Sequence, residues 1–168
     1  MKTLKFTISK WLTLSLLISL TFNCSNDDDN AAPQMEAWEI EVEQVRMATT
    51  QYADINVALN EGFFDASGFV PNMGHHYISP PRFENGFNLL EPEILLYAPD
   101  GNGNMEFVAV EYGIVVPDPE NPGTPPEGFS GDLDEWHFNH ELSQWQLHVW
   151  IVKENPDGIF APFNPTVN

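Results

Sequence analysis

The stretch that decides the fold covers residues 93–116 and reads EILLYAPDGNGNMEFVAVEYGIVV. Two apolar runs, residues 93–97 and 105–116, flank residues 99–104, which are rich in Gly, Asn and Asp. Short apolar runs bounded by turn residues are typical of β-strands, and a Gly/Asn-rich segment between two of them is typical of a hairpin. The stretch therefore predicts two antiparallel strands joined by a tight turn.

Two further apolar runs, residues 75–78 and 144–152, predict two more strands. Upstream of all four runs, apolar residues recur at helical spacing with Glu and Gln between them, which predicts an amphipathic helix over residues 36–60. Because such a helix buries its apolar face against another element, we expect a single α+β domain over residues 35–168. In this domain a curved, four-stranded antiparallel sheet packs around the helix. Residues 117–131 contain five prolines and three glycines, and we expect a loop there.

The N-terminus has the pattern of an export signal. Three lysines lie within the first ten residues, and an apolar run follows over residues 11–20, which predicts a signal peptide over residues 1–23. This run is shorter than the roughly 20 residues that a transmembrane helix needs. Cys24 follows directly and precedes an acidic run, so we expect a lipid-anchored protein with Cys24 as the lipidated residue and residues 24–34 as an acidic tether. The alternative is an ordinary cleaved signal in which Cys24 has no role.

The chain is strongly acidic, with 25 acidic and 6 basic residues and a formal net charge of −19. Removal of the signal leaves only Arg46, Arg82 and Lys153 as basic residues. Such a surface repels phosphate groups, so we expect no nucleic-acid partner, and we expect the acyl chains on Cys24 rather than surface charge to hold the protein at a membrane. Cys24 is the only cysteine, which excludes an intramolecular disulfide and a thiolate metal site.

The strongest chemical signal is the clustering of all five histidines in two short stretches. Neighbouring residues of a strand face opposite sides, so only one of His75 and His76 is expected at a given site. His76, Glu111 and His148 lie on three different predicted strands and could meet on one sheet face. Two histidines and a carboxylate predict a site for one divalent metal ion, zinc or copper. The alternative is that His148 is a half-buried histidine bonded to a backbone carbonyl.

A second pair, His137 and His140, follows an acidic segment. On a helical turn this spacing places both on one face beside Glu141, but we favour a polar loop rim. The many Tyr and Trp side chains offer flat faces for sugar rings, although most are expected in the core.

Five segments carry a resemblance to known proteins: VPNMGHHY at 70–77, EILLYAPDG at 93–101, VEY at 110–112, LHVW at 147–150 and NPDGIFAPFNP at 155–165. They resemble a family of small, mostly uncharacterised bacterial exported proteins, over about residues 52–165. The signal and the acidic stretch after Cys24 are similar to those of Bacteroidota lipoproteins, many of which are directed to the outer membrane. In marine members, small lipoproteins of this type often accompany polysaccharide breakdown. The chain also resembles a small dehydratase acting on oligosaccharides released from the algal polysaccharide ulvan.

The resemblance implies a carbon–oxygen lyase in the cell outer membrane that removes water from uronate-containing oligosaccharides. Such an elimination needs a base, an acid and a positive group on the substrate carboxylate. We expect His76 or His148 as the base and Tyr77 as the acid. Arg82 or the metal is expected at the carboxylate, and Trp150 as a substrate-binding residue. The alternative is a non-enzymatic lipoprotein that holds zinc, copper or a glycan.

Overall fold

The structure, a computed structural model, describes residues 34–168. Met35–Asn168 forms one compact unit. The predicted signal peptide, Cys24 and the tether up to residue 33 lie outside the described residues. Within residues 34–168, no helix combines the length and the apolar character needed to cross a membrane.

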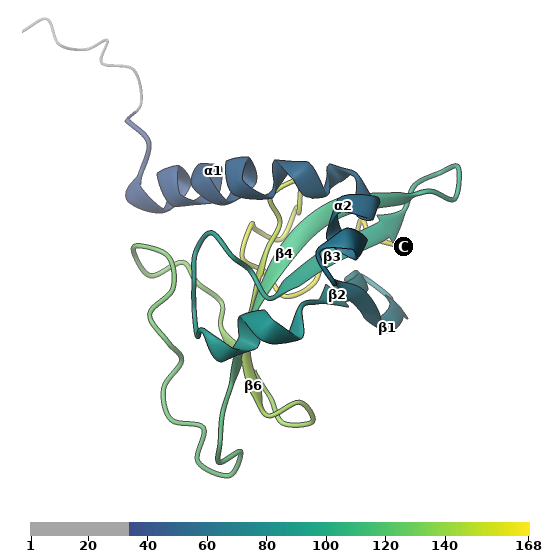
Figure 1. The fold of residues 1–168 in the computed structure, drawn as a ribbon. Helices are drawn as coiled ribbons and strands as arrows, with labels where there is room; N and C mark the ends of the chain where they lie inside the picture. The colour runs from purple at the N-terminus through teal and green to yellow at the C-terminus, as the bar shows by residue number, and fades with distance from the viewer. Residues whose placement is uncertain (1–33) are drawn as a thin grey trace, which may run out of the picture. The chain divides into compact units, whose positions relative to one another are not determined.

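The described chain is α+β, as predicted, with one antiparallel sheet that curls into a half-barrel (Figure 1). The sheet has six strands in the order β1-β2-β3-β4-β6-β5. The strands are β1 (Phe64–Val70), β2 (Gly74–Ile78), β3 (Ile94–Pro99), β4 (Met105–Val115), β5 (His137–Asn139) and β6 (Gln144–Val149). The four predicted strands correspond to β2, β3, β4 and β6, but the predicted count of four is wrong, because β1 and β5 extend the sheet at its two edges.

The two strands that sequence reasoning missed lack an apolar pattern. Six of the seven residues of β1 are exposed, and Gly68 interrupts the strand. The strand β5 has three residues, all partly exposed. Their pairing to β2 and β6 comes from backbone hydrogen bonds of the folded sheet, which sequence periodicity does not record.

Two irregularities accompany the curl of the sheet. The pairing register shifts between Asp65 and Phe69, where β1 meets β2, and between Leu96 and Tyr97, where β3 meets β4. Bulges of this kind increase the local twist and bend the strand that carries them. The turn between β3 and β4 forms as predicted, with Asp100 accepting hydrogen bonds from the backbone N–H groups of Asn102 and Asn104.

The predicted helix over residues 36–60 is not continuous. It divides into α1 (Ala37–Thr49), the 3₁₀ turn η1 (Thr50–Ala53) and α2 (Ile55–Asn60). Asp54 has extended backbone angles, and its side chain accepts a hydrogen bond from the Asn56 N–H, so it caps α2. The apolar period continues through the break because Tyr52, in η1, is also buried.

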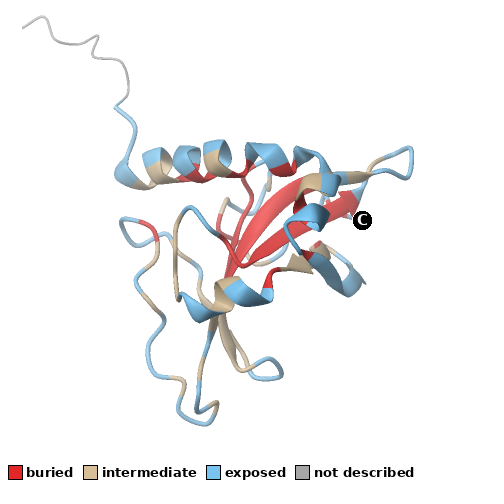
Figure 2. Ribbon diagram, in the orientation of Figure 1, coloured by how far each residue is buried: buried red, intermediate tan, exposed pale blue. Residues whose placement is uncertain are grey.

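The core has two parts, one on each face of the sheet. On the larger side, Val42 and Val45 of α1 pack with Tyr97, Val110 and Leu147 of the sheet. On the opposite side, Leu96 and Ala109 pack with Trp150 and Val167. Figure 2 shows the buried residues concentrated in the central strands.

The C-terminal tail lies across the domain. The Asn164 N–H donates to the Asn72 carbonyl, and the Asn72 N–H donates to the Val167 carbonyl, so the tail is tied to the turn between β1 and β2. Residues 117–131 form neither helix nor strand, which confirms the predicted loop.

Candidate metal centre

Three strands bring His76, Glu111 and His148 together on the sheet face opposite α1. Glu111 on β4 pairs directly with His148 on β6. His76 on β2 reaches across the intervening strand β3, where Leu96 is its pairing partner. One nitrogen or oxygen atom of each side chain lies within 4.8 Å of the other two. The structure therefore confirms the prediction that these three residues meet on one face.

The carboxylate of Glu111 lies between the two imidazoles. Its Oε2 atom is 3.3 Å from His76 Nε2 and 3.5 Å from His148 Nε2. Glu111 and His148 are buried, and among the described residues neither oxygen of Glu111 and neither nitrogen of His148 has a hydrogen-bond partner. The alternative of a backbone-bonded His148 is therefore wrong. Buried polar atoms without partners are rare in native proteins because burying them without a partner costs free energy.

Burial also decides the charge of the cluster. It raises the pKa of Glu111 to about 8, and the nearby Glu93 carboxyl adds to this effect. Burial lowers the pKa of His76 to about 4, and it lowers the pKa of His148 well below its ordinary value. Near neutral pH, without a bound cation, the carboxyl therefore holds a proton and both rings are neutral. Neutral imidazole is the form that binds a metal.

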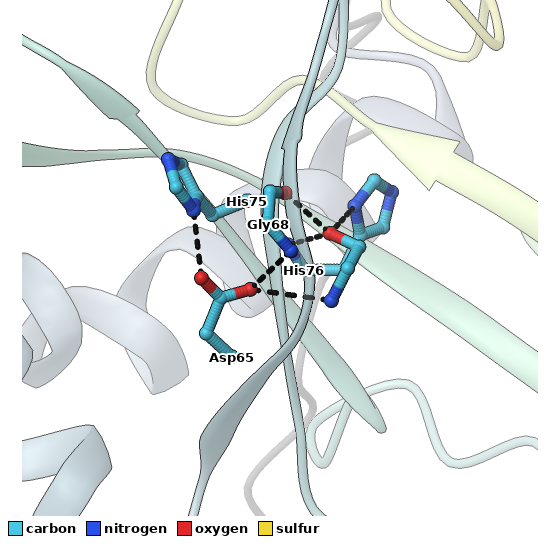
Figure 3. A network of polar contacts seen from close by, with 5 residues as sticks. Asp65, Gly68, His75 and His76 are labelled. Atoms are coloured by element: carbon cyan, nitrogen blue, oxygen red, sulfur yellow. Dashed lines mark hydrogen bonds and ion pairs between the residues drawn. The ribbon is translucent and has the colours of Figure 1, made fainter.

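The edge strand β1 contacts the cluster through Ser67. The Ser67 Oγ atom lies 3.0 Å from His76 Nδ1, and Asp65 accepts hydrogen bonds from the backbone N–H groups of Ser67 and Gly68. On the other side of β2, His75 Nδ1 lies 2.8 Å from Asp65 Oδ2 (Figure 3). His75 and His76 thus point to opposite sides, as predicted. Sequence reasoning missed Ser67, because β1 itself carries no recognisable pattern.

The cluster forms part of the wall of a cavity of about 470 Å³. Apolar side chains on this wall include those of Val70, Met73, Ile78, Phe83, Ile94 and Leu142. Neutral polar groups come from Ser67, Asn139, Gln144 and Gln146. Glu141 is the one ionisable residue of the lining besides the cluster, and no Lys or Arg of residues 34–168 lines it.

Tyr77, the predicted general acid, does not reach this cavity. It follows His76 in β2 and therefore faces the α1 side, where its ring packs against Tyr97 with centroids 5.0 Å apart. The alternation of a strand that separates His75 from His76 also separates Tyr77 from His76.

Arg82 and Trp150, the predicted substrate-binding residues, do not line the cavity either. The Arg82 guanidinium donates to the Pro92 carbonyl and to the Tyr52 hydroxyl, and it lies 3.6 Å from Glu61. The Trp150 ring is buried, and its indole N–H donates to the carbonyl of Ala161. Both side chains are used in packing the domain.

His137 and His140 do not lie on a helical turn. His137 belongs to β5, and its ring stacks on His148 with centroids 5.7 Å apart. His140 is exposed in the turn after β5 and contacts Phe138. His137 therefore packs beside the cluster, whereas His140 lies in an exposed turn, as predicted for that residue.

Comparison of the chain with protein-family models, curated proteins and solved structures gives no match.

Proposed function

We propose that the protein is a metal-dependent enzyme whose divalent ion, zinc in preference to copper, is held by His76, Glu111 and His148. One observation carries the proposal: side chains from three strands, with His76 partly exposed and Glu111 and His148 buried, bring one ligand atom each to one point. The atoms of Glu111 and His148 have no hydrogen-bond partner among the described residues. Ligand atoms about 2.0–2.1 Å from a tetrahedral zinc ion lie about 3.3–3.4 Å apart. The separations of 3.3 Å and 3.5 Å from Glu111 Oε2 to the two imidazoles match this spacing.

The cavity supports a catalytic role in preference to a structural one. Structural zinc sites use four protein ligands, whereas catalytic sites use three and leave a position for water or substrate. The described residues supply three ligands, and the same side chains line a cavity large enough for a sugar-sized molecule. The lining residues include no Lys or Arg. A metal bound there would therefore supply the positive charge that an anionic substrate group needs.

We propose that the reaction is the elimination expected from the resemblance, in which a carbon–oxygen lyase removes water from a uronate-containing oligosaccharide. The C–H bond next to the carboxylate and the C–O bond of the departing hydroxyl break, a double bond forms, and the proton and hydroxyl leave as water. Histidines that bind the metal cannot also take this proton. Glu141, the remaining ionisable residue of the lining, is our candidate for the base in place of His76 or His148.

The second candidate is a non-enzymatic protein that holds the metal or a glycan in this cavity. It is favoured by the placement of Tyr77 and Arg82, since neither of these groups lines the cavity. In either case we propose that the protein is an outer-membrane lipoprotein attached through Cys24.

Zinc titration of the purified metal-free protein tests the ligand set. We expect one site, and Glu111→Gln and His148→Ala should each weaken zinc binding by more than about 100-fold, because an outer-shell partner alone contributes roughly 10–100-fold. The matched control is His140→Ala, which removes an exposed histidine outside the cluster and should bind zinc as the wild type does. A wild type that binds no zinc, or a Glu111→Gln variant with unchanged affinity, would contradict the proposed centre.

Mass spectrometry of uronate-containing oligosaccharides incubated with the protein tests the reaction. We expect a loss of one water, about 18 Da, that a chelator abolishes and zinc restores. Glu141→Gln should lower turnover by roughly two to four orders of magnitude while zinc binding persists. If the metal-loaded protein leaves every oligosaccharide of such a panel unchanged, the binding role replaces the lyase.

A further inference from the structure

The bulge of β1 is built around the carboxylate of Asp65. Its Oδ1 atom accepts the backbone N–H groups of Ser67 at 3.2 Å and Gly68 at 2.9 Å. Gly68 has a φ of +65°, a left-handed conformation that side-chain-bearing residues rarely adopt. Together these contacts hold the Ser67 hydroxyl against β2 at His76.

The hydrogen bonds of Ser67 fix the direction of its contact with His76. The hydroxyl donates to the Gly68 carbonyl at 2.7 Å, and its oxygen accepts the backbone N–H of His76 at 3.0 Å. A hydroxyl has one proton to donate, and here the proton is already used. Toward His76 Nδ1, also 3.0 Å away, the Ser67 oxygen can therefore only accept, so the proton of this contact belongs to Nδ1.

A neutral imidazole with its proton on Nδ1 has a lone pair on Nε2. In His76 this Nε2 atom is the one that lies 3.3 Å from Glu111 Oε2. The lone pair of the ring and the oxygen of the carboxyl thus face the same point, where a cation between them would be bound by both. The opposite tautomer would put a proton at that point and block the position.

We propose that Ser67 is a positioning residue that holds His76 as its Nδ1–H tautomer, with Nε2 free for the metal, and that Asp65 keeps Ser67 in place by shaping the bulge. The effect of Ser67 on metal affinity rests on the proposed metal centre. The tautomer of His76 does not, because it can be measured in metal-free protein. Metal-binding histidines generally have such a partner on the other ring nitrogen, and its removal costs roughly 10–100-fold in affinity.

A purely structural role of Ser67 makes a different prediction. If the hydroxyl only closed the bulge, its loss would lower stability and leave the His76 tautomer and the zinc affinity unchanged. The experiment must therefore measure the tautomer of His76 and the zinc affinity, with the free energy of unfolding as a control.

The test is nitrogen-15 NMR of histidine-labelled, metal-free protein, with the His76 signals assigned by their absence in His76→Gln. In the wild type we expect a protonated Nδ1 and an unprotonated Nε2. In Ser67→Ala we expect a mixture of tautomers and zinc affinity lower by roughly 10–100-fold. The matched control is Ser130→Ala, because Ser130 also donates its hydroxyl proton, to Glu41, but does not line the cavity. This variant should keep both the wild-type tautomer and the wild-type affinity.

Asp65 variants test the second half of the inference. Asp65→Asn keeps a side-chain oxygen that can accept both backbone N–H groups, so it should retain the wild-type tautomer, whereas Asp65→Ala should behave like Ser67→Ala. A wild-type His76 protonated on Nε2, or an unchanged tautomer in Ser67→Ala, would overturn the inference even if zinc binds. Failure of the wild type to bind zinc, with the tautomers as expected, would overturn the metal centre and support the positioning role.

Discussion

Glu111 is the residue whose protonation state controls whether the cluster can bind a cation. A buried carboxyl group without a hydrogen-bond donor nearby is unfavourable in its charged form, and this is why its pKa is raised to about 8. A divalent cation at the two imidazoles removes this penalty, because it supplies the positive charge that the surrounding residues lack. Metal binding should therefore release one proton from Glu111 near neutral pH.

A second buried carboxyl, that of Glu93, makes the stability of the metal-free protein depend on pH. Burial raises the pKa of Glu93 to about 7. Between about pH 4.5 and pH 7 the Glu93 carboxyl keeps a proton in the folded protein that it has lost in the unfolded chain, so the contribution of Glu93 to stability is greatest below this window and falls as pH rises through it. From this group alone the fall amounts to about 3 kcal/mol, and Glu111 acts in the same direction, whereas the lowered pKa values of His76 and His148 act in the opposite direction below about pH 6.5.

Chemical denaturation of the metal-free protein at pH 5 and pH 8 measures this effect. Glu93→Gln should reduce the difference, because an amide stays neutral and can still accept the Gly113 N–H that Glu93 Oε2 accepts at 3.1 Å. Glu84→Gln, at an exposed position, is the control and should leave the difference unchanged. Equal pH dependence in the wild type and Glu93→Gln would show that Glu93 does not hold this proton.

At the residue scale, sequence reasoning predicted the ligands but not their surroundings. His76, Glu111 and His148 could be assigned to one face because each lies in a strand whose alternation is visible in the sequence. The assignment of Tyr77 to the same site ignored that alternation. The roles of Arg82 and Trp150 could not be predicted, because each depends on a distant backbone carbonyl, of Pro92 and Ala161, that only the folded chain brings near.

At the scale of elements, the curl of the sheet brings β2 and β4 together across β3. Gly74, the first residue of β2, has a φ of +97°, and a Cβ atom there would lie 2.5 Å from the backbone oxygen of Tyr97 on β3. The close approach of β2 to β3 therefore requires glycine at position 74.

Gly74→Ala should destabilise the protein by about 2–4 kcal/mol, because a left-handed alanine is strained and its methyl group clashes with backbone. The matched control is Gly103→Ala in the turn between β3 and β4, where φ is +85° but no atom lies within 4 Å of the added Cβ. This control should lose only the conformational part, about 1–2 kcal/mol. Equal losses in the two variants, measured by chemical denaturation, would mean that β2 and β3 are not packed this closely.

The elements also show why the sheet was only partly predictable. The strands β3 and β4 were visible because they are almost entirely buried and apolar. The edge strand β1 is held by pairing to β2 and by the Asp65 contacts, so its sequence resembles a loop. The helix break at Asp54 was not predicted because the apolar pattern is present there: the buried Tyr52 continues the helical period through the break.

At the scale of the whole molecule, charge and anchoring belong together. The chain carries 25 acidic residues, which repel anionic lipid headgroups. We predict that Cys24→Ser moves the protein from the membrane fraction to the soluble fraction, because acyl chains on Cys24 are the proposed attachment. A variant that still sediments with membranes after a salt wash would contradict the lipid anchor.

The metal centre itself is tested most directly by anomalous X-ray diffraction at the zinc absorption edge, from crystals of the protein soaked in zinc. We expect one strong anomalous peak about 2.0–2.2 Å from His76 Nε2, Glu111 Oε2 and His148 Nε2, and no peak at this position in Glu111→Gln crystals. A wild-type crystal with no peak between these three side chains, or with zinc only at carboxylates on the surface, would contradict the proposed site.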